Sequence, residues 1–449
     1  VILNIPLNHT STEHPWFIES QSSEKSEKRD WYIWHKGKNK RKSPNNWKTV
    51  FGETAWTWNE QREEFYYHSF FSKQADLNWR NQSLRNEVKK IFKYWLNLGV
   101  DGIHLDVINF FIKDKDFKQN PRSYGKRKFP FDLHNHEYDI NRPGVHDLMR
   151  EFRRILDSYK EKILIGGVIN QEPKDQFRSV DYLGNGSDEL NLVMDYKLQF
   201  SSWSPKMIYN GITNLFSLLP EKSWPCNFLS NHNFPRVMSR FAGTVAAAKV
   251  ARAFLLMIKG TPILYYGEEI GMEHPILKRS ELQDNLGKQY WPRFKGRDLM
   301  RSPMQWNEEE HAGFSEVDPW IPVHHDYEKN NAHILSETRD SILQITKELI
   351  TLRNKKESLH KGDMVPVFEG NDGIIAFFRV YNFEKILVIL NFSNNIKRVE
   401  FSDSEQWKVI FSNEKIIGKE FTSLRFEIQP YEITIIESIG MRNFQVEYV

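Results

Sequence analysis

Apolar and polar residues alternate along six short stretches of the chain, and segments with a helical period lie between them. The stretches predict strands at residues 1–7, 100–107, 162–169, 189–196, 226–233 and 261–267. Amphipathic helices are expected at 82–98 and 144–159, and an alanine-rich helix follows the fifth strand. Strands that alternate with helices are typical of a parallel sheet in an α/β fold. We expect residues 1–7 to form a buried strand.

Two further regions have other patterns. Residues 18–82 are polar, aromatic and rich in turn-forming residues, which predicts a loop-rich excursion from the sheet. From about Asp363 onwards, short alternating stretches follow one another closely, as in GIIAFFRVY and KILVILNFS. This second pattern predicts a small antiparallel β-domain at the carboxyl end of the chain.

Asp106 comes at the end of the strand predicted at 100–107. A carboxylate at the carboxyl end of a parallel strand is where barrel enzymes place catalytic groups. An aspartate there could equally cap the helix that follows. Spacing alone leaves both interpretations open.

Composition narrows the function classes. Of the 449 residues, the acids and bases nearly balance at a net charge of +3, so nothing indicates a nucleic-acid partner. No apolar run reaches the length of a membrane span, and we expect no membrane partner. A single cysteine, Cys226, excludes an internal disulfide and favours a cytoplasmic, reducing location. The fourteen Trp and seventeen Tyr could stack on sugar rings, although packing accounts for most of them.

Several motifs resemble those of glycoside hydrolase family 13, the α-amylase family, in its α-glucosidase and oligo-1,6-glucosidase branch. GVDGIHLDVIN at 99–109 is similar to the family pattern G-x-D-G-F-R-x-D-V-I-N. NHTSTEHPWF, QADLNW, GTPILYYGEEIGM and RDLMRSPMQWNEEEHAGFS match further family motifs. The resemblance implies a (β/α)8 TIM-type barrel at 1–9 and 83–362, a domain B excursion at 10–82 and a C-terminal β-domain at 363–449. It also implies that Asp106 is the nucleophile of a retaining α-glucosidase, and Val107 resembles members that prefer α-1,6 linkages.

The sequence departs from the family at four signature positions. Asn4 occupies a position where the family has an aspartate, and His104 one where the family has an arginine. Gly167 occupies the position of the family's glutamate, which is the general acid/base. Asn233 occupies the position of the family's aspartate that stabilises the transition state. The resemblance implies substrate contacts for His9, His104, His232 and Arg236. The family barrel has eight strands where this sequence shows six, so we expect the first two βα units, about sixty residues, to be missing upstream.

The chemistry that these residues can support is incomplete. Retaining glycosidases need two carboxyl groups, and Gly167 cannot move a proton. Glu172, in the loop after that strand, is a weak substitute candidate. His134 and His136 invite a metal interpretation, which we reject because no further ligand completes a set. Glu268 and Glu269 are expected to be structural.

Three functional hypotheses follow. The first is an α-glucosidase-type hydrolase that acts weakly or not at all on short α-glucosides. The second is a non-catalytic protein that binds sugar or another subunit, and the third is a decayed gene product. We expect a small oligosaccharide or glucoside as partner and neither metal nor cofactor, and the sequence leaves the oligomeric state open.

Overall fold

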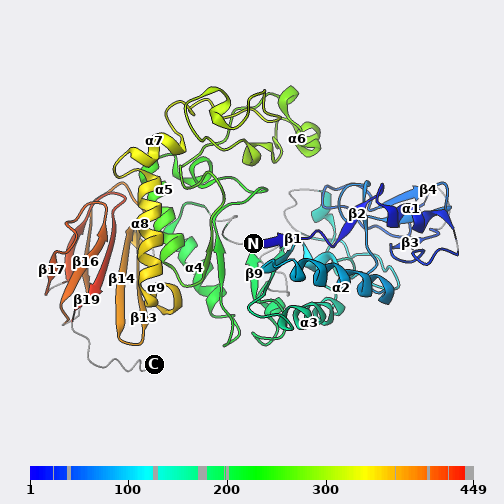
Figure 1. Cartoon of the computed structure of the whole chain (residues 1–449), viewed down its shortest axis with the longest axis horizontal. Coiled ribbons are helices and arrows are strands. Elements are labelled where there is room, and N and C mark those ends of the chain that lie inside the picture. Colours follow the sequence, from blue (N-terminus) through cyan, green and yellow to red (C-terminus); the bar gives the residue numbers. More distant parts are fainter. Residues whose placement is uncertain are drawn as a thin grey trace. The chain divides into compact units, whose positions relative to one another are not determined.

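The computed structural model describes residues 1–449 except 24, 38–41, 125–129, 170–178, 197, 199–201, 370, 402–404, 423 and 440–449. The chain divides into two compact units. Unit 1 comprises residues 1–196 and 219–224, and unit 2 comprises residues 197–218 and 225–449. Figure 1 follows the chain from β1, in blue, to β19, in red.

Unit 1 contains a parallel sheet. Its strands lie in the order β1 (Ile2–Asn4), β7 (Gly102–Leu105), β8 (Ile163–Val168) and β9 (Leu192–Asp195). Helix α2 (Gln82–Asn97) precedes β7, and α3 (Gly144–Asp157) connects β7 to β8. The two helices lie side by side (Figure 1), with the rings of Phe92 and Phe152 4.8 Å apart. This βαβ order brings the carboxyl ends of adjacent strands to one edge of the sheet.

Helix α2 begins where its sequence provides a cap. The Asn81 side chain accepts a hydrogen bond from the backbone N–H of Leu84, which satisfies one of the free donors of the first turn. Four apolar side chains of the helix are buried: Leu84, Val88, Phe92 and Leu96. Their spacing places them on one face, which is the face that the sequence pattern predicts to pack against the sheet.

The excursion between β1 and α2 is made of short elements around aromatic rings. Its elements are β2 (His9–Ser11), α1 (Pro15–Ser22), β3 (Trp34–His35), β4 (Trp56–Asn59), β5 (Glu64–Tyr67) and β6 (Gln74–Asp76). Strand β2 pairs with β6, and β5 pairs with both β3 and β4. The buried rings of Trp47, Trp56 and Tyr67 pack together there.

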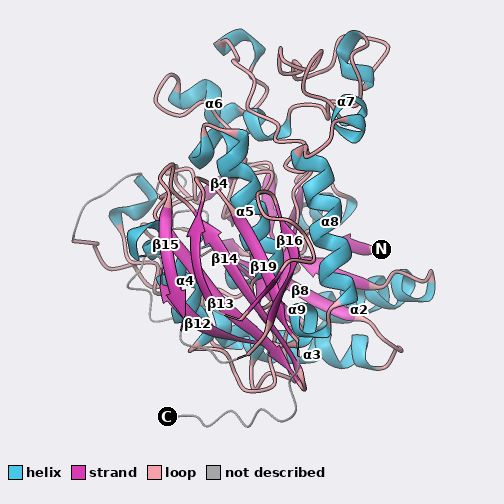
Figure 2. Cartoon of the chain, turned by 90° about the vertical axis from the view of Figure 1, so that its left-hand side faces the viewer, coloured by secondary structure: helices cyan, strands magenta, loops and turns pink. Residues whose placement is uncertain are grey.

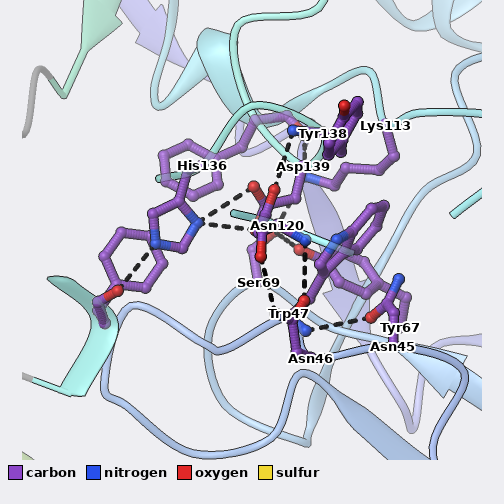
Figure 3. Close-up of polar contacts among 12 residues, drawn as sticks. Asn45, Asn46, Trp47, Tyr67, Ser69, Lys113, Asn120, His136, Tyr138 and Asp139 are labelled. Carbon is purple, nitrogen blue, oxygen red and sulfur yellow. Dashed lines mark hydrogen bonds and ion pairs between the residues drawn. The ribbon is translucent and has the colours of Figure 1, made fainter. Parts of the chain in front are cut away.

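Hydrogen bonds join this excursion to the segment that follows β7 (Figure 3). Asn46 and Asn120 exchange two of them: the Asn46 amide donates to the Asn120 carbonyl at 2.8 Å, and the Asn120 N–H donates to Asn46 Oδ1 at 2.9 Å. The Trp47 indole donates to the Lys118 carbonyl at 2.9 Å. Segments some seventy residues apart in sequence are therefore held by specific polar contacts.

Unit 2 begins with a second parallel element. Strands β10 (Cys226–Phe228) and β11 (Thr261–Ile263) pair in parallel and are connected through α5 (Val245–Met257). The other described helices of unit 2 are α4 (Pro205–Phe216), α6 (Asn285–Tyr290), α7 (Ala332–Glu337), α8 (Ile342–Lys355) and α9 (Glu357–Lys361). Short 3₁₀ segments of unit 1 lie at Ile108–Phe110, Pro130–Leu133 and Ser179–Leu183. Those of unit 2 lie at Arg279–Glu281, Asp298–Arg301, Glu310–Gly313 and Asn371–Gly373. Unit 2 also has a π-helical segment, Met238–Ala242.

The carboxyl end of unit 2 is an antiparallel sheet (Figure 2). Its order is β12 (Asp363–Glu369), β13 (Ile374–Tyr381), β14 (Glu384–Asn391), β19 (Ile433–Ser438), β16 (Trp407–Ser412) and β17 (Glu420–Phe421). A separate pair is formed by β15 (Lys397–Phe401) and β18 (Leu424–Ile428). Side chains of α4, α5 and α8 share one buried apolar cluster with β13 and β14, so the helices cover this sheet on one face.

The structure shows all six predicted parallel-sheet strands, although each is shorter than predicted. The strand predicted at 226–233 ends at Phe228, because the following residues turn so that Phe234 N–H donates to the Asn231 carbonyl. The expectation that 1–7 is buried is wrong for β1. Ile2 is 46% exposed, because β1 pairs only with β7 among the described residues. The sequence pattern also missed β12, β15, β17 and β18.

Candidate active site

Asp106 lies immediately after β7, at the carboxyl edge of the sheet in unit 1. Val107, the next residue, has φ 46° and ψ 42°, a left-handed conformation that is strongly disfavoured for a β-branched side chain. The turn leads into the 3₁₀ segment Ile108–Phe110, and the Val107 N–H donates to Asp106 Oδ1 at 2.9 Å. Strained backbone of this kind concentrates at functional sites. No side-chain hydrogen bond caps that 3₁₀ segment, so Asp106 does not serve as its cap.

Gly167 and His104 lie beside Asp106. Strands β7 and β8 are in register at Leu105 and Gly166, so the residues after them are neighbours. A Cβ atom at Gly167 would lie 2.9 Å from Asp106 Oδ1 and 3.7 Å from His104 Nε2. Three predicted site residues from two strands are therefore brought together in unit 1.

At position 104, where the family motif has an arginine, this chain has a histidine, whose charge depends on pH. Its Nε2 is buried and has no hydrogen-bond partner among the described residues. Burial lowers the pKa of His104 below its usual value, and the Asp106 carboxylate opposes that shift. A neutral imidazole cannot hold Asp106 with the paired, charged hydrogen bonds that an arginine offers.

His9, on β2, is held by contacts within the excursion. The Gln74 amide lies 2.9 Å from His9 Nε2, and the His9 ring packs against Phe70 with centroids 5.5 Å apart. Burial lowers the pKa of His9, while Asp76 and Asp106 act in the opposite direction. Asn4, on the edge strand β1, pairs with His104 in the backbone register, and its side chain is exposed.

Asn233 and His232 lie in the loop after β10, in unit 2. Asn233 Oδ1 accepts a hydrogen bond from Arg301 at 3.1 Å, and the same guanidinium donates to the His232 carbonyl at 3.1 Å. The His232 side chain is exposed. Arg301 thus orients Asn233, the asparagine at the predicted stabiliser position.

Arg236 is fully buried in unit 2, with 0% of its surface exposed. Its guanidinium donates to the Tyr266 carbonyl at 3.3 Å and to Ser302 Oγ at 3.3 Å, and it packs over the Tyr266 ring at 4.9 Å. Its backbone N–H donates to His274 Nε2 at 3.0 Å. These contacts hold three loops together, and the predicted substrate contact of Arg236 stays a prediction.

His274 should make unit 2 sensitive to acid. Burial, with the charges of Arg236 and His324, lowers the pKa of His274 to about 4. The unfolded chain therefore binds the proton first, so stability is complete above pH 6.5 and falls as the pH drops towards 4. The expected loss in the free energy of unfolding is about 3 kcal/mol.

Urea unfolding of the full chain at pH 7 and pH 4.5 measures this loss. His274→Gln keeps a hydrogen-bond acceptor for Arg236 without a titrating group, and it should reduce the difference between the two pH values. His333→Gln, at a side chain that is 55% exposed, is the matched control and should leave the difference unchanged. Equal acid sensitivity in His274→Gln and the natural chain would contradict the prediction.

The paired glutamates after β11 differ in their surroundings. Glu268 is buried; it accepts hydrogen bonds from Ser230 Oγ and the Val237 N–H, and its carboxylate lies 3.4 Å from Arg252. These contacts fit the structural role that we expected. Glu269 instead lines a cavity of about 390 Å³ whose other walls include Arg301, Trp306, Phe314 and Trp320.

Of the two histidines considered for metal binding, His136 has other partners. His136 Nδ1 lies 2.9 Å from Asp139, and its Nε2 lies 3.0 Å from the Phe131 carbonyl. Among the residues that the structure describes, no group of three His, Cys, Asp or Glu side chains could hold a metal ion. Glu172, the weak acid candidate, lies outside the described residues.

Sequence reasoning gave no role to two residues that lie near predicted site residues, one in each unit. Tyr196, just after β9, would place its Oη 3.4 Å from a Cβ at Gly167, and burial together with the Asp106 charge raises the pKa of this phenol. Arg301 was part of a quoted motif, but no role was given to it. Its position in that motif, R-D-x-x-R, was the one available signal, whereas no signal in the sequence indicated Tyr196.

Comparison with known proteins identifies the family. The model of the α-amylase catalytic domain matches residues 1–362. This chain therefore belongs to the α-amylase family, and the fold class predicted from the sequence, a TIM-type barrel sheet with a C-terminal antiparallel β-domain, is confirmed.

Individual relatives agree with this assignment. The chain is 34% identical over 429 residues to an oligo-1,6-glucosidase of Parageobacillus thermoglucosidasius, with 88% of this chain and 74% of that protein covered. Among solved structures, it is similar to an α-glucosyl transfer enzyme, with a TM-score of 0.89, 27% identity, and 98% and 83% of the two chains covered. It is also similar to the trehalose-6-phosphate hydrolase of Bacillus licheniformis, with a TM-score of 0.84, 29% identity, and the same coverage. Among the described helices, none is both long enough and apolar enough to cross a membrane.

Proposed function

We propose that this chain is an α-glucosidase-type glycoside hydrolase with a weakened retaining mechanism. Asp106 is the nucleophile, and short α-glucosides, preferably α-1,6-linked, are the substrates. The supporting observation is the position of Asp106 at the carboxyl edge of the parallel sheet, held by a strained turn and adjoining the acid/base position. The similarity to an oligo-1,6-glucosidase supports the substrate class. We assign 1–9 and 83–362 to the barrel, 10–82 to domain B and 363–449 to domain C.

The weakness follows from two absent carboxylates. Gly167 provides no proton to the departing sugar oxygen, and general acid/base catalysis contributes about 10²–10⁴ in rate. Asn233 is neutral where a negative charge would stabilise the oxocarbenium-like transition state. Both absent carboxylates would lower the rates of the chemical steps. Neither is needed for the proposed substrate contacts of His9 and His232, so substrate binding can persist. Arg236 joins loops of unit 2 through its contacts with Tyr266 and Ser302.

An activated aryl α-glucoside tests the proposal, because its leaving group needs little acid assistance. We expect slow aryl release by the natural chain and release at the background rate by Asp106→Asn. Asp114→Asn is a control at an aspartate outside the site. Equal release by the natural chain and Asp106→Asn would remove the catalytic proposal.

The losses at Gly167 and Asn233 favour one alternative, a sugar-binding protein without turnover. Isothermal titration with isomaltose distinguishes it: heat of binding without any Asp106-dependent release would support the alternative. Heat together with such release supports the hydrolase.

A further inference from the structure

A cavity of unit 1 has polar walls and no part in the proposed hydrolysis. Its volume is about 410 Å³, and it is lined by Asn46, Asn120, Arg122, Leu133 and His134. Asn46 belongs to the excursion, and the other four residues belong to the segment that follows β7. None of the five is a predicted catalytic or substrate-binding residue, so the cavity is a separate candidate for a binding site.

Asn120 is held in place with one donor group unused. Its backbone N–H donates to Asn46 Oδ1 at 2.9 Å, and its carbonyl accepts a hydrogen bond from the Asn46 amide at 2.8 Å (Figure 3). Its Oδ1 accepts a hydrogen bond from the Tyr138 N–H at 3.0 Å. The residue is 3% exposed, and its Nδ2 is buried without a partner among the described residues. A buried donor without a partner is costly, and a bound group that accepts its hydrogen bond would remove that cost.

Arg122 and His134 face each other across a short antiparallel bridge. Backbone hydrogen bonds flank the pair on both sides: the Ser123 N–H donates across the bridge at 3.0 Å, and the Asn135 N–H donates in the opposite direction at 2.8 Å. The pair itself is therefore of the non-hydrogen-bonded type, in which the Cα atoms lie about 4.5 Å apart and the side chains are close. The guanidinium and the imidazole consequently stand on one face of the bridge.

The charges around this pair favour an anion. Within the part of the chain that the structure describes, the Arg122 side chain forms no hydrogen bond or ion pair. Burial lowers the pKa of His134, whose Nδ1 also has no partner among the described residues. Three neighbouring groups lower this pKa further, namely His136, Lys48 and Arg122, and Asp139 raises it. Because Asp139 is itself bound to His136 at 2.9 Å, the surroundings of His134 carry an excess of positive charge.

We propose that this cavity binds a phosphate group, carried by inorganic phosphate or by a small phosphate monoester. A guanidinium such as that of Arg122 binds two phosphate oxygens at once, and the Asn120 Nδ2 and the His134 imidazole can donate to the others. A carboxylate has only two oxygens and would leave part of this donor set unused. The volume of about 410 Å³ is in the range of small-molecule sites, so the organic part of a monoester has room.

Isothermal titration of the full chain tests the proposal, with sodium phosphate and sodium glycerol 3-phosphate as probes and sodium chloride at equal ionic strength as control. We expect saturable binding of phosphate or of both probes, with a Kd of about 1 mM or tighter, and no binding of chloride. Tighter binding of glycerol 3-phosphate would identify a monoester as the ligand. Equal affinity, or a preference for phosphate, would identify free phosphate.

Two variants assign the binding to this cavity. Arg122→Gln removes the guanidinium at an exposed position and should weaken binding by about tenfold or more. Asn120→Asp keeps the acceptor for the Tyr138 N–H but replaces the Nδ2 donor by a carboxylate oxygen, so it should abolish binding. Lys118→Gln is the matched control, because it removes a positive charge from a side chain that is 56% exposed and does not line the cavity. It should bind both probes as the natural chain does.

Three outcomes would overturn the proposal. The first is the absence of saturable heat with both probes, and the second is equal affinity of the natural chain and Arg122→Gln. The third is an equal loss of affinity in Lys118→Gln and Arg122→Gln, because a general effect of charge would then explain the binding. The Arg122 side chain has no partner among the described residues, so Arg122→Gln should fold even if Asn120→Asp does not, and the melting temperature of each variant checks this. None of these outcomes depends on the proposed hydrolysis.

Discussion

Hydrolysis of isomaltose is expected to rise by about 10²–10⁴-fold when Gly167 is replaced by glutamate. Isomaltose has a poor leaving group, so its cleavage depends on a proton donor much more than cleavage of an aryl glucoside does. The substitution returns a carboxyl group to the strand adjacent to Asp106. Retaining glycosidases need such a pair about 5 Å apart.

The local geometry can accept the new side chain. A Cβ atom added at Gly167 would approach Asp106 Oδ1 to 2.9 Å, and the other nearby atoms lie at 3.4 Å or beyond. The atom that must move is the end of a side chain and not backbone. We therefore expect the Asp106 carboxylate to rotate away from the new side chain.

Gly167→Gln is the matched control for this prediction. Glutamine has the same size as glutamate but has no acidic proton, so it should give no gain on isomaltose. Initial rates of glucose release for the natural chain, Gly167→Glu and Gly167→Gln measure the difference. An equal rate for all three would contradict the assignment of Gly167 to the acid/base position.

Under the proposed function, Asn233→Asp should add to the gain, because it restores the negative charge of the predicted stabiliser. The two effects need not multiply, since acid and stabiliser act on one transition state. Arg301 already donates to Asn233 Oδ1, so an aspartate there would find a charged partner in place.

The strands could be predicted from the sequence because alternation reports directly on which residues face the core. The exposure of β1 could not be predicted from the sequence. It depends on which strands lie beside Ile2 and not on Ile2 itself. Asp106, His104 and Gly167 were found from motifs, and the parallel register of β7 and β8 explains why they meet. Tyr196 and the turn at Val107 were missed, because a phenol beside Gly167 and a left-handed backbone arise only from tertiary packing.

Asp76→Ala is expected to lower the free energy of unfolding by about 3–5 kcal/mol. Asp76 is 1% exposed, and its carboxylate lies 3.3 Å from the ammonium of Lys113. It also accepts hydrogen bonds from the Ser69 N–H at 2.8 Å and from Ser69 Oγ at 2.6 Å. Removing the carboxylate leaves a buried ammonium without its ionic partner.

Lys113 has few alternatives once Asp76 is gone. Its ammonium donates to Ser69 Oγ at 3.1 Å and to the Phe110 carbonyl, and it lies 5.0 Å from the centre of the Tyr67 ring. Figure 3 shows Lys113 among Ser69, Tyr67 and Asp139. Burial lowers the pKa of Lys113, against the opposing effects of Asp76 and Asp139. Without Asp76 that pKa falls further, so the folded state would hold the ammonium only at greater cost.

The double variant Asp76→Ala/Lys113→Met tests whether the cost comes from the unpaired charge. Methionine fills a similar volume without charge, so the double variant should be more stable than Asp76→Ala alone. Urea unfolding followed by tryptophan fluorescence measures both, and Asp116→Ala, at an exposed aspartate, is the control. If the double variant were less stable than the single one, the ion pair would not be what makes Asp76 necessary. Asp76 belongs to the excursion, and Lys113 follows β7. The ion pair between them therefore joins the excursion to the segment after the turn at Asp106. The result just described would show that this ion pair does not stabilise that connection.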